Sequence, residues 1–131
     1  MIVTKLANIQ LAKDARKISE FVLSYHNVMP KKYKYTFGDI LLTEINNLNK
    51  CCRRACYVFD AKQKAMYLEE AELLIVDIVG VMEVLFDAKA ITTEHKARFD
   101  VMAIGIGKQV SALRKVTEKR LGSIEGPLTS E

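Results

Sequence analysis

The sequence predicts an all-α protein, an antiparallel up-down four-helix bundle. Apolar residues recur at helical spacing along almost the whole chain, and no stretch alternates with the two-residue period of a strand. The 131 residues, half of them hydrophobic, suffice for one core and exclude wholesale disorder. Short connections between long helices favour antiparallel neighbours. We expect the bundle over residues 1–121 and a flexible C-terminal tail over residues 122–131.

The first two helices are expected on either side of Pro30. Proline lacks a backbone N–H and disfavours helical geometry in the residue before it, so a helix from about Ile9 should end by Val28. Thr36 and Asp39 predict a new start, with the hydroxyl as cap and the carboxylate in the first turn, for a helix reaching Phe59. The expected inward residues are Leu11, Ala15, Ile18, Val22 and Tyr25, then Phe37, Leu41, Ile45, Leu48, Cys52, Ala55 and Phe59.

The last two helices are predicted from their end signals. Asp60 followed by Gln63 resembles a capping box and predicts a helix over about 61–88. A fourth helix should start near Thr92 and end at Lys119-Arg120-Leu121-Gly122. Cations are favourable at the negative C-terminal pole of a helix, and a glycine often follows the last helical residue. Its expected inward residues are Phe99, Met102, Ile106, Val110, Leu113 and either Val116 or Thr117.

The third helix carries more apolar residues than one bundle face can bury. They cover nearly its whole circumference and are Leu73, Leu74, Ile75, Val76, Ile78, Val79, Val81, Met82, Val84, Leu85 and Phe86. A bundle buries only one stripe of each helix. We therefore expect a homo-oligomer, in which a second copy covers the remaining face. The alternative is a long, central third helix.

Membrane, metal and catalytic functions are not expected. No apolar run approaches the roughly 18–20 residues of a membrane span, and the N-terminal residues lack the order of a signal peptide, so we expect a cytoplasmic protein. A di-iron bundle needs a glutamate three residues before each ligating histidine. Here Leu23 stands three residues before His26, and Thr92 stands three residues before His95. We expect no metal and no cofactor. No cysteine–histidine spacing suggests a nucleophile, so we expect no enzyme activity.

Three cysteines, Cys51, Cys52 and Cys56, lie within six residues on one predicted helix. An odd number so placed makes a poor disulfide framework, and the spacing is not that of a zinc site. We interpret them as buried free thiols, with a metal or redox bundle as the weaker alternative.

The net charge of +4 is unevenly distributed. Residues 1–35 carry seven basic and two acidic groups, whereas residues 61–91 carry three basic and six acidic groups. Lysine and arginine neutralise phosphates regardless of sequence, and tyrosine can stack on unpaired bases. The candidate nucleic-acid-binding residues are Lys31, Lys32, Lys34, Lys50, Arg53, Arg54, Lys108, Arg114, Lys115, Lys119 and Arg120. The alternative is that these are solvated helix faces, with Tyr33 and Tyr35 plugging the bundle end.

The segment Pro30-Lys31-Lys32-Tyr33-Lys34-Tyr35-Thr36-Phe37-Gly38-Asp39 resembles a Pro-x-x-x-Arg/Lys-aromatic-x-Leu/Phe-Gly joint between two helices. That joint occurs in the accessory variability determinant (Avd) proteins of diversity-generating retroelements and in relatives encoded in 23S ribosomal RNA intervening sequences. The resemblance covers roughly residues 9–121. Avd proteins often carry a tryptophan after a glycine late in the fourth helix, and this chain has none.

The resemblance implies a pentameric, non-catalytic accessory protein that binds template RNA or RNA/DNA and a reverse transcriptase, and so supports mutagenic copying. A second hypothesis remains open: a structural oligomeric adaptor, or an intervening-sequence-type bundle protein, with an acidic protein or RNA as partner.

Overall fold

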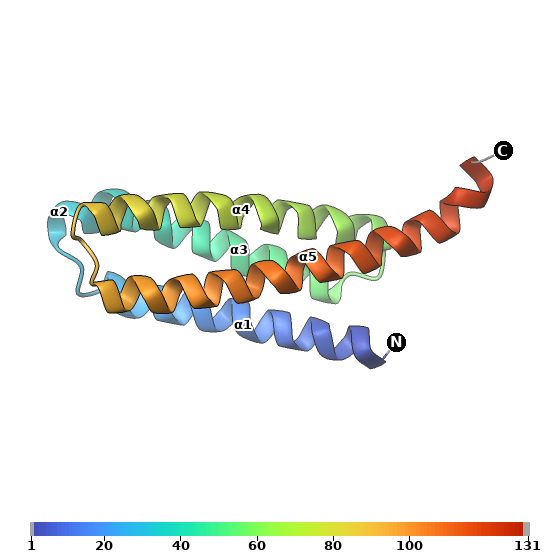
Figure 1. The fold of residues 1–131 in the computed structure, drawn as a ribbon, viewed down its shortest axis with the longest axis horizontal. Coiled ribbons are helices and arrows are strands. Elements are labelled where there is room, and N and C mark those ends of the chain that lie inside the picture. The colour runs from blue at the N-terminus through green and yellow to red at the C-terminus, as the bar shows by residue number, and fades with distance from the viewer. Residues whose placement is uncertain (1, 130–131) are drawn as a thin grey trace.

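In a computed structural model, which describes the backbone of residues 2–129 and the side chains of residues 5–122, the chain is almost entirely helical. Its long helices are α1 (Ile2–His26), α3 (Asp39–Tyr57), α4 (Ala61–Asp87) and α5 (Thr93–Thr129). They run alternately up and down, and α5 extends beyond the other three toward the C-terminus (Figure 1). No strand occurs in the described residues, so the predicted all-α class is confirmed.

The helices pack as a square rather than around a central helix. The main contacts join α1 to α3, α3 to α4, α4 to α5 and α5 to α1. Consequently α3 and α5 occupy diagonal corners, and the α1–α3 edge lies opposite the α4–α5 edge. Because α4 is a corner helix, the alternative of a central third helix is wrong.

The predicted core is largely confirmed. All five inward residues expected on the first helix are buried, as are Leu41, Ile45, Leu48, Cys52 and Ala55 on α3. On α5, Phe99, Ile106, Val110 and Leu113 are buried, while Met102 is half-buried. Thr117, not Val116, completes this face: it is 2% exposed, and its hydroxyl donates to the Leu113 carbonyl oxygen at 2.7 Å.

Two predicted core residues, Phe37 and Phe59, are exposed by 41% and 103%. Phe37 lies in η1 (Lys34–Gly38), a π-helical turn that holds more residues per turn than an α-helix. The change of register therefore moves Phe37 off the face predicted from α-helical spacing. Phe59 follows the end of α3 at Tyr57, in the extended connection to α4, where helical spacing no longer applies.

The joint around Pro30 is a compact helical turn instead of an open loop. Helix α1 ends at His26, and α2 (Lys31–Tyr33) continues into η1. Thr36 does not cap a helix, because its hydroxyl lies 3.3 Å from the Lys32 carbonyl oxygen and donates backward. His26 Nε2 instead ties the joint together, 3.2 Å from the Lys34 carbonyl oxygen and 3.0 Å from Asp39 Oδ1.

The starts of α4 and α5 lie where the sequence predicts them, and one predicted helix end is wrong. Asp60 Oδ1 accepts from the Lys62 backbone N–H at 3.2 Å, and Thr92 Oγ1 accepts from His95 N–H at 3.1 Å. The end predicted at Gly122 is wrong, because α5 continues to Thr129. Gly122 does not adopt the positive φ of a terminating glycine. The flexibility of residues 122–131 stays a prediction, and residues 130–131 lie outside the described part.

The apolar surplus of α4 is left uncovered in the single chain. Its Ile78, Met82 and Leu85 are buried, but Leu73 and Val76 are 63% and 68% exposed. We call five of the exposed apolar side chains of α4 and α5 the apolar surface; they are Leu73, Val76, Val84, Val101 and Ile104. Between the two helices lies a groove of about 300 Å³ whose lining includes Ile75, Val79, Ala103 and Ile104. No helix in the described part of the chain has the length and hydropathy that a membrane crossing requires.

Candidate nucleic-acid interface

The structure does not bring the sequence-selected basic residues together. Lys31, Lys32 and Lys34 lie at one end of the bundle, in α2 and η1. Lys50, Arg53 and Arg54 lie near the other end of α3, whose 19 residues make about 28 Å of helix. The remaining five, Lys108, Arg114, Lys115, Lys119 and Arg120, lie on α5, at the corner diagonal to α3. The three lysines of the joint are therefore separated from the other eight candidates, which lie on two diagonal helices.

Two of the three lysines of the joint lie over the rings of neighbouring tyrosines. Lys32 Nζ lies 5.5 Å from the Tyr33 ring centroid, and Lys34 Nζ lies 5.6 Å from that of Tyr35. Tyr33 packs against the core, as the plug interpretation predicts. Tyr35 is 62% exposed and does not plug the bundle end.

Arg114 is held in an ion-pair network. Its Nε lies 2.7 Å from Glu118 Oε1, and its Nη1 lies 2.9 Å from Glu72 Oε2. The hydrogen bond that Arg114 donates to Glu118 and the charge of Glu72 raise the pKa of the guanidinium. Arg114 is thus already neutralised by carboxylates and is the least available of the α5 cations for a phosphate.

A basic groove that the sequence reasoning missed lies along the α1–α3 edge. It has a volume of about 290 Å³ and is lined by Ile9, Ala12, Lys13, Arg16, Asn49, Arg53 and Tyr57. Among the described side chains that line it, none is acidic. Arg16 Nε lies 3.7 Å from Glu20 Oε1, but both side chains are about 70% exposed, so this pair constrains Arg16 weakly.

Helical spacing could have revealed each wall of the basic groove separately. On α3, Asn49, Arg53 and Tyr57 are four residues apart and share one face. On α1, Lys13 and Arg16 share a face with Ile9 in the same way. What the spacing could not reveal is that these two faces meet, because that depends on which helices are neighbours.

A second cavity opens at the end of the bundle, next to the basic groove. We call it the Lys64 pocket; it has a volume of about 460 Å³ and is lined by Lys5, Asn8, Cys56, Tyr57, Val58, Phe59, Ala61, Lys64 and Arg120. Tyr57 borders both cavities, so the basic surface continues from one to the other. Lys5 and Lys64 are further cations that the sequence reasoning did not select.

Lys64 is an unusual member of this surface because it is only 6% exposed. Its Nζ donates to Asn8 Oδ1 at 3.0 Å, and no described carboxylate pairs with it. Burial lowers the pKa of Lys64 below its usual value of 10.5. The charge of Arg120 lowers this pKa further, while Cys56 acts in the opposite direction.

The lowered pKa of Lys64 predicts a pH-dependent stability. Between that pKa and 10.5, the unfolded chain binds more protons than the folded chain, so stability rises with pH in this window. Below this window Lys64 is charged in the folded and the unfolded chain, and its whole destabilising contribution is present. We therefore expect Lys64→Met to be more stable than the wild type at pH 7, and the difference to shrink as the pH approaches 10.5. Thermal unfolding of both proteins between pH 7 and 10.5 measures this; a difference that grows with pH would contradict it.

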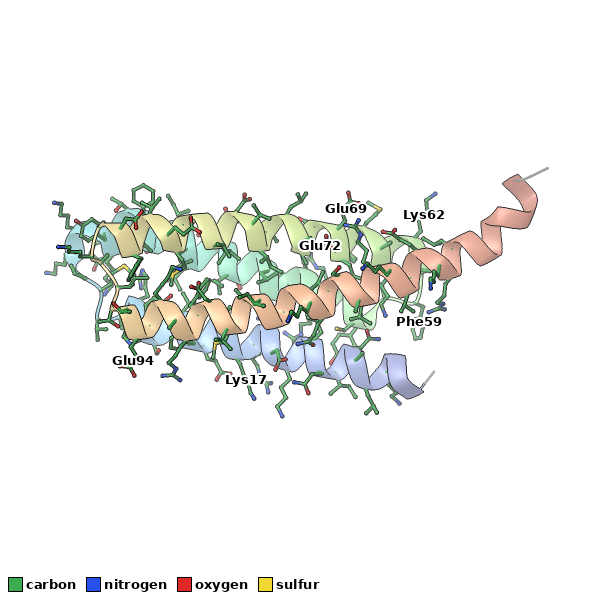
Figure 2. The ribbon with its side chains drawn as sticks, viewed as in Figure 1. Lys17, Phe59, Lys62, Glu69, Glu72 and Glu94 are labelled. Atoms are coloured by element: carbon green, nitrogen blue, oxygen red, sulfur yellow. The ribbon has the colours of Figure 1, made fainter. Side chains whose placement is uncertain are left out.

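Two aromatic side chains project beside the cations. Tyr57 is 72% exposed and Phe59 is 103% exposed. Figure 2 shows Phe59 at the end of the bundle where α3 connects to α4, with Lys62 projecting outward from α4 nearby. An exposed ring among cations is the arrangement in which aromatic residues stack on unpaired bases.

The cysteines form free, largely buried thiols, as predicted. Cys51 and Cys52 are buried and Cys56 is half-buried. Burial raises the pKa of Cys51 to about 11 and that of Cys52 to about 12, so both remain protonated at neutral pH. The described residues contain no group of three or more histidine, cysteine or carboxylate side chains placed to hold a metal ion.

Comparisons with protein-family models, with curated proteins and with solved structures give no match to this chain.

Proposed function

We propose that this chain is a non-catalytic accessory protein that binds single-stranded nucleic acid along the basic groove. The observation that carries the proposal is the convergence of Lys13, Arg16 and Arg53 from two helices, with Tyr57 exposed at the end of the groove. Cations that line one groove can bind phosphates together, and an adjacent exposed ring can stack on a base. Such contacts confer affinity without sequence readout.

The resemblance of the joint at 30–39 to Avd proteins gives the proposal its finer form. In that form the nucleic acid is the template RNA or RNA/DNA of a diversity-generating retroelement, the protein partner is its reverse transcriptase, and the setting is the cytoplasm. The protein then supports copying without carrying out chemistry itself. A reverse-transcriptase gene beside the gene for this chain would support this form.

The apolar surface supports a homo-oligomer in the same proposal, a ring of five copies by resemblance. Leu73 and Val76 of α4 and Val101 and Ile104 of α5 are each more than half exposed. A second copy seated on them would cover apolar area that water otherwise contacts. This surface lies on the edge opposite the basic groove, so association there leaves the groove open.

The test is charge reversal in the groove. We expect Lys13→Glu, Arg16→Glu and Arg53→Glu together to weaken binding of a single-stranded RNA oligonucleotide at least tenfold at about 0.1 M salt. The wild-type affinity should fall steeply with salt, and the triple variant should lose about 0.7 of that slope for each phosphate contact removed. Filter binding across a salt series measures both quantities.

The matched comparison is Lys31→Glu, Lys32→Glu and Lys34→Glu, which changes the net charge equally at the other end of the bundle. We expect this triple variant to lose much less affinity. If it loses more than the groove variant, the interface lies at the joint and the groove assignment is wrong. If the wild type binds no RNA yet binds a protein partner, the adaptor hypothesis replaces this one.

A further inference from the structure

The Lys64 pocket holds a buried charge that no carboxylate of the described residues neutralises. Removing an ammonium from water is costly unless it is paired and hydrogen-bonded. A lysine ammonium has three donors, and Asn8 Oδ1, at 3.0 Å, is the one side-chain acceptor it contacts in the described residues. A lysine selected only for stability would be exposed or would be replaced by an apolar residue.

The two other charged side chains that line the Lys64 pocket are also cationic. Lys5 comes from α1 and Arg120 from α5, and both line the same cavity. Ala61, the first residue of α4, lines it too, which places the positive pole of a 27-residue helix at the pocket. Asp60 is the nearest carboxylate in sequence, and its side chain accepts from the Lys62 N–H. None of the described residues that line the Lys64 pocket is acidic.

The exposed rings indicate what accompanies the anion. Phe59 and Tyr57 both line the pocket and are exposed by 103% and 72%. Exposing an entire phenylalanine side chain has no benefit for folding, since apolar area is stabilised by burial. A cavity that combines three cations with two exposed rings is suited to a ligand that has both an anionic group and a flat ring.

We infer that the Lys64 pocket binds the phosphate of a nucleotide, with Phe59 or Tyr57 stacking on its base. The phosphate oxygens accept from Lys64 Nζ, while Lys5 and Arg120 close the pocket around the anion. The inference deepens the proposed function by assigning one nucleotide to a defined position beside the basic groove. If that nucleotide is part of a bound strand, the inference rests on the proposed function. The same chemistry also fits a free nucleotide.

The experiment compares Lys64→Met with Lys62→Met, a neighbouring exposed lysine on the same helix that lines neither cavity. Thermal unfolding is measured without ligand, then with inorganic phosphate, with adenosine monophosphate and with a single-stranded RNA oligonucleotide. Without ligand, we expect Lys64→Met to raise the midpoint by about 3 °C, and Lys62→Met to leave it unchanged. Lys64→Arg serves as a second variant that keeps the charge.

With ligand, we expect adenosine monophosphate to raise the wild-type midpoint and to protect Lys62→Met equally. Lys64→Met should lose this shift, Lys64→Arg should keep part of it, and Phe59→Ala should reduce it for adenosine monophosphate but not for inorganic phosphate. Protection by the oligonucleotide without protection by adenosine monophosphate would identify the strand as the source of the phosphate. Protection by both would identify any nucleotide as a ligand.

The inference is overturned if Lys64→Met keeps the wild-type response to every ligand, or if no ligand protects the wild type. Its failure is distinguishable from that of the proposed function. If Lys64→Met binds RNA like the wild type while the groove variant does not, the pocket inference fails and the groove stands. If adenosine monophosphate protects the wild type through Lys64 but the groove variant leaves RNA affinity unchanged, the groove proposal fails and the pocket stands.

Discussion

Replacing Phe99 with alanine is expected to lower the free energy of unfolding by about 3–5 kcal/mol. Phe99 is fully buried and is the largest of the side chains that are so. Truncation removes the apolar area that the ring withdraws from water and leaves a cavity in the core that the rigid helices fill only partly. Urea unfolding followed by circular dichroism measures the loss, at matched protein concentrations because association would stabilise the fold.

The chain contains its own control in Phe59→Ala. The two substitutions are chemically identical, but Phe59 is 103% exposed where Phe99 is 0% exposed. We expect Phe59→Ala to change the free energy of unfolding by no more than about 0.5 kcal/mol. Equal losses in the two variants would contradict the packing described here.

Replacing Gly38 with alanine is expected to destabilise the fold by about 1–3 kcal/mol. An added Cβ would lie 2.9 Å from Met29 Sδ and 3.1 Å from the Tyr33 carbonyl oxygen. Met29 is 5% exposed and has little room to withdraw, and the carbonyl belongs to the backbone of the joint. The backbone of Gly38 is helical, with φ of −62°, so the expected loss comes from crowding alone.

Gly105→Ala is the matched control and should have the opposite sign. A Cβ at Gly105 would meet nothing within 4 Å, and the residue lies inside α5. Alanine there removes backbone freedom from the unfolded chain and should stabilise the protein by about 0.5–1 kcal/mol. A stabilising effect at Gly38 as well would mean that the joint yields easily and does not fix the angle between α1 and α3.

The sequence predicted the fold well because its signals are local. The spacing of Leu11, Ala15 and Ile18 specifies one face of a helix, and any neighbouring helix can cover that face. Phe37 was misassigned because a π turn changes the period inside one element, and Phe59 because the helix ends two residues before it. Both errors lie at helix ends, where spacing carries the least information.

The candidate site was predicted less well because it depends on contacts between helices. The residues chosen from sequence were those that cluster along the chain, such as the lysines at 31–34. The groove and the pocket instead combine single cations from distant segments: Lys13 with Arg53, and Lys5 with Lys64 and Arg120. The pairing of α1 with α3 makes neighbours of Lys13 and Arg53, whereas the charges of the pocket come from α1, α4 and α5. No local pattern specifies either arrangement.

The opposite placement of the apolar surface and the basic groove has a consequence for affinity. If copies associate through α4 and α5, each copy presents its groove on the outer side of the assembly. A nucleic-acid strand held in one groove then meets the groove of the neighbouring copy at a high effective concentration. Weak individual sites therefore give tight overall binding. Avidity of this kind would require no tight contact within a single copy, and it would disappear when the assembly is dissociated.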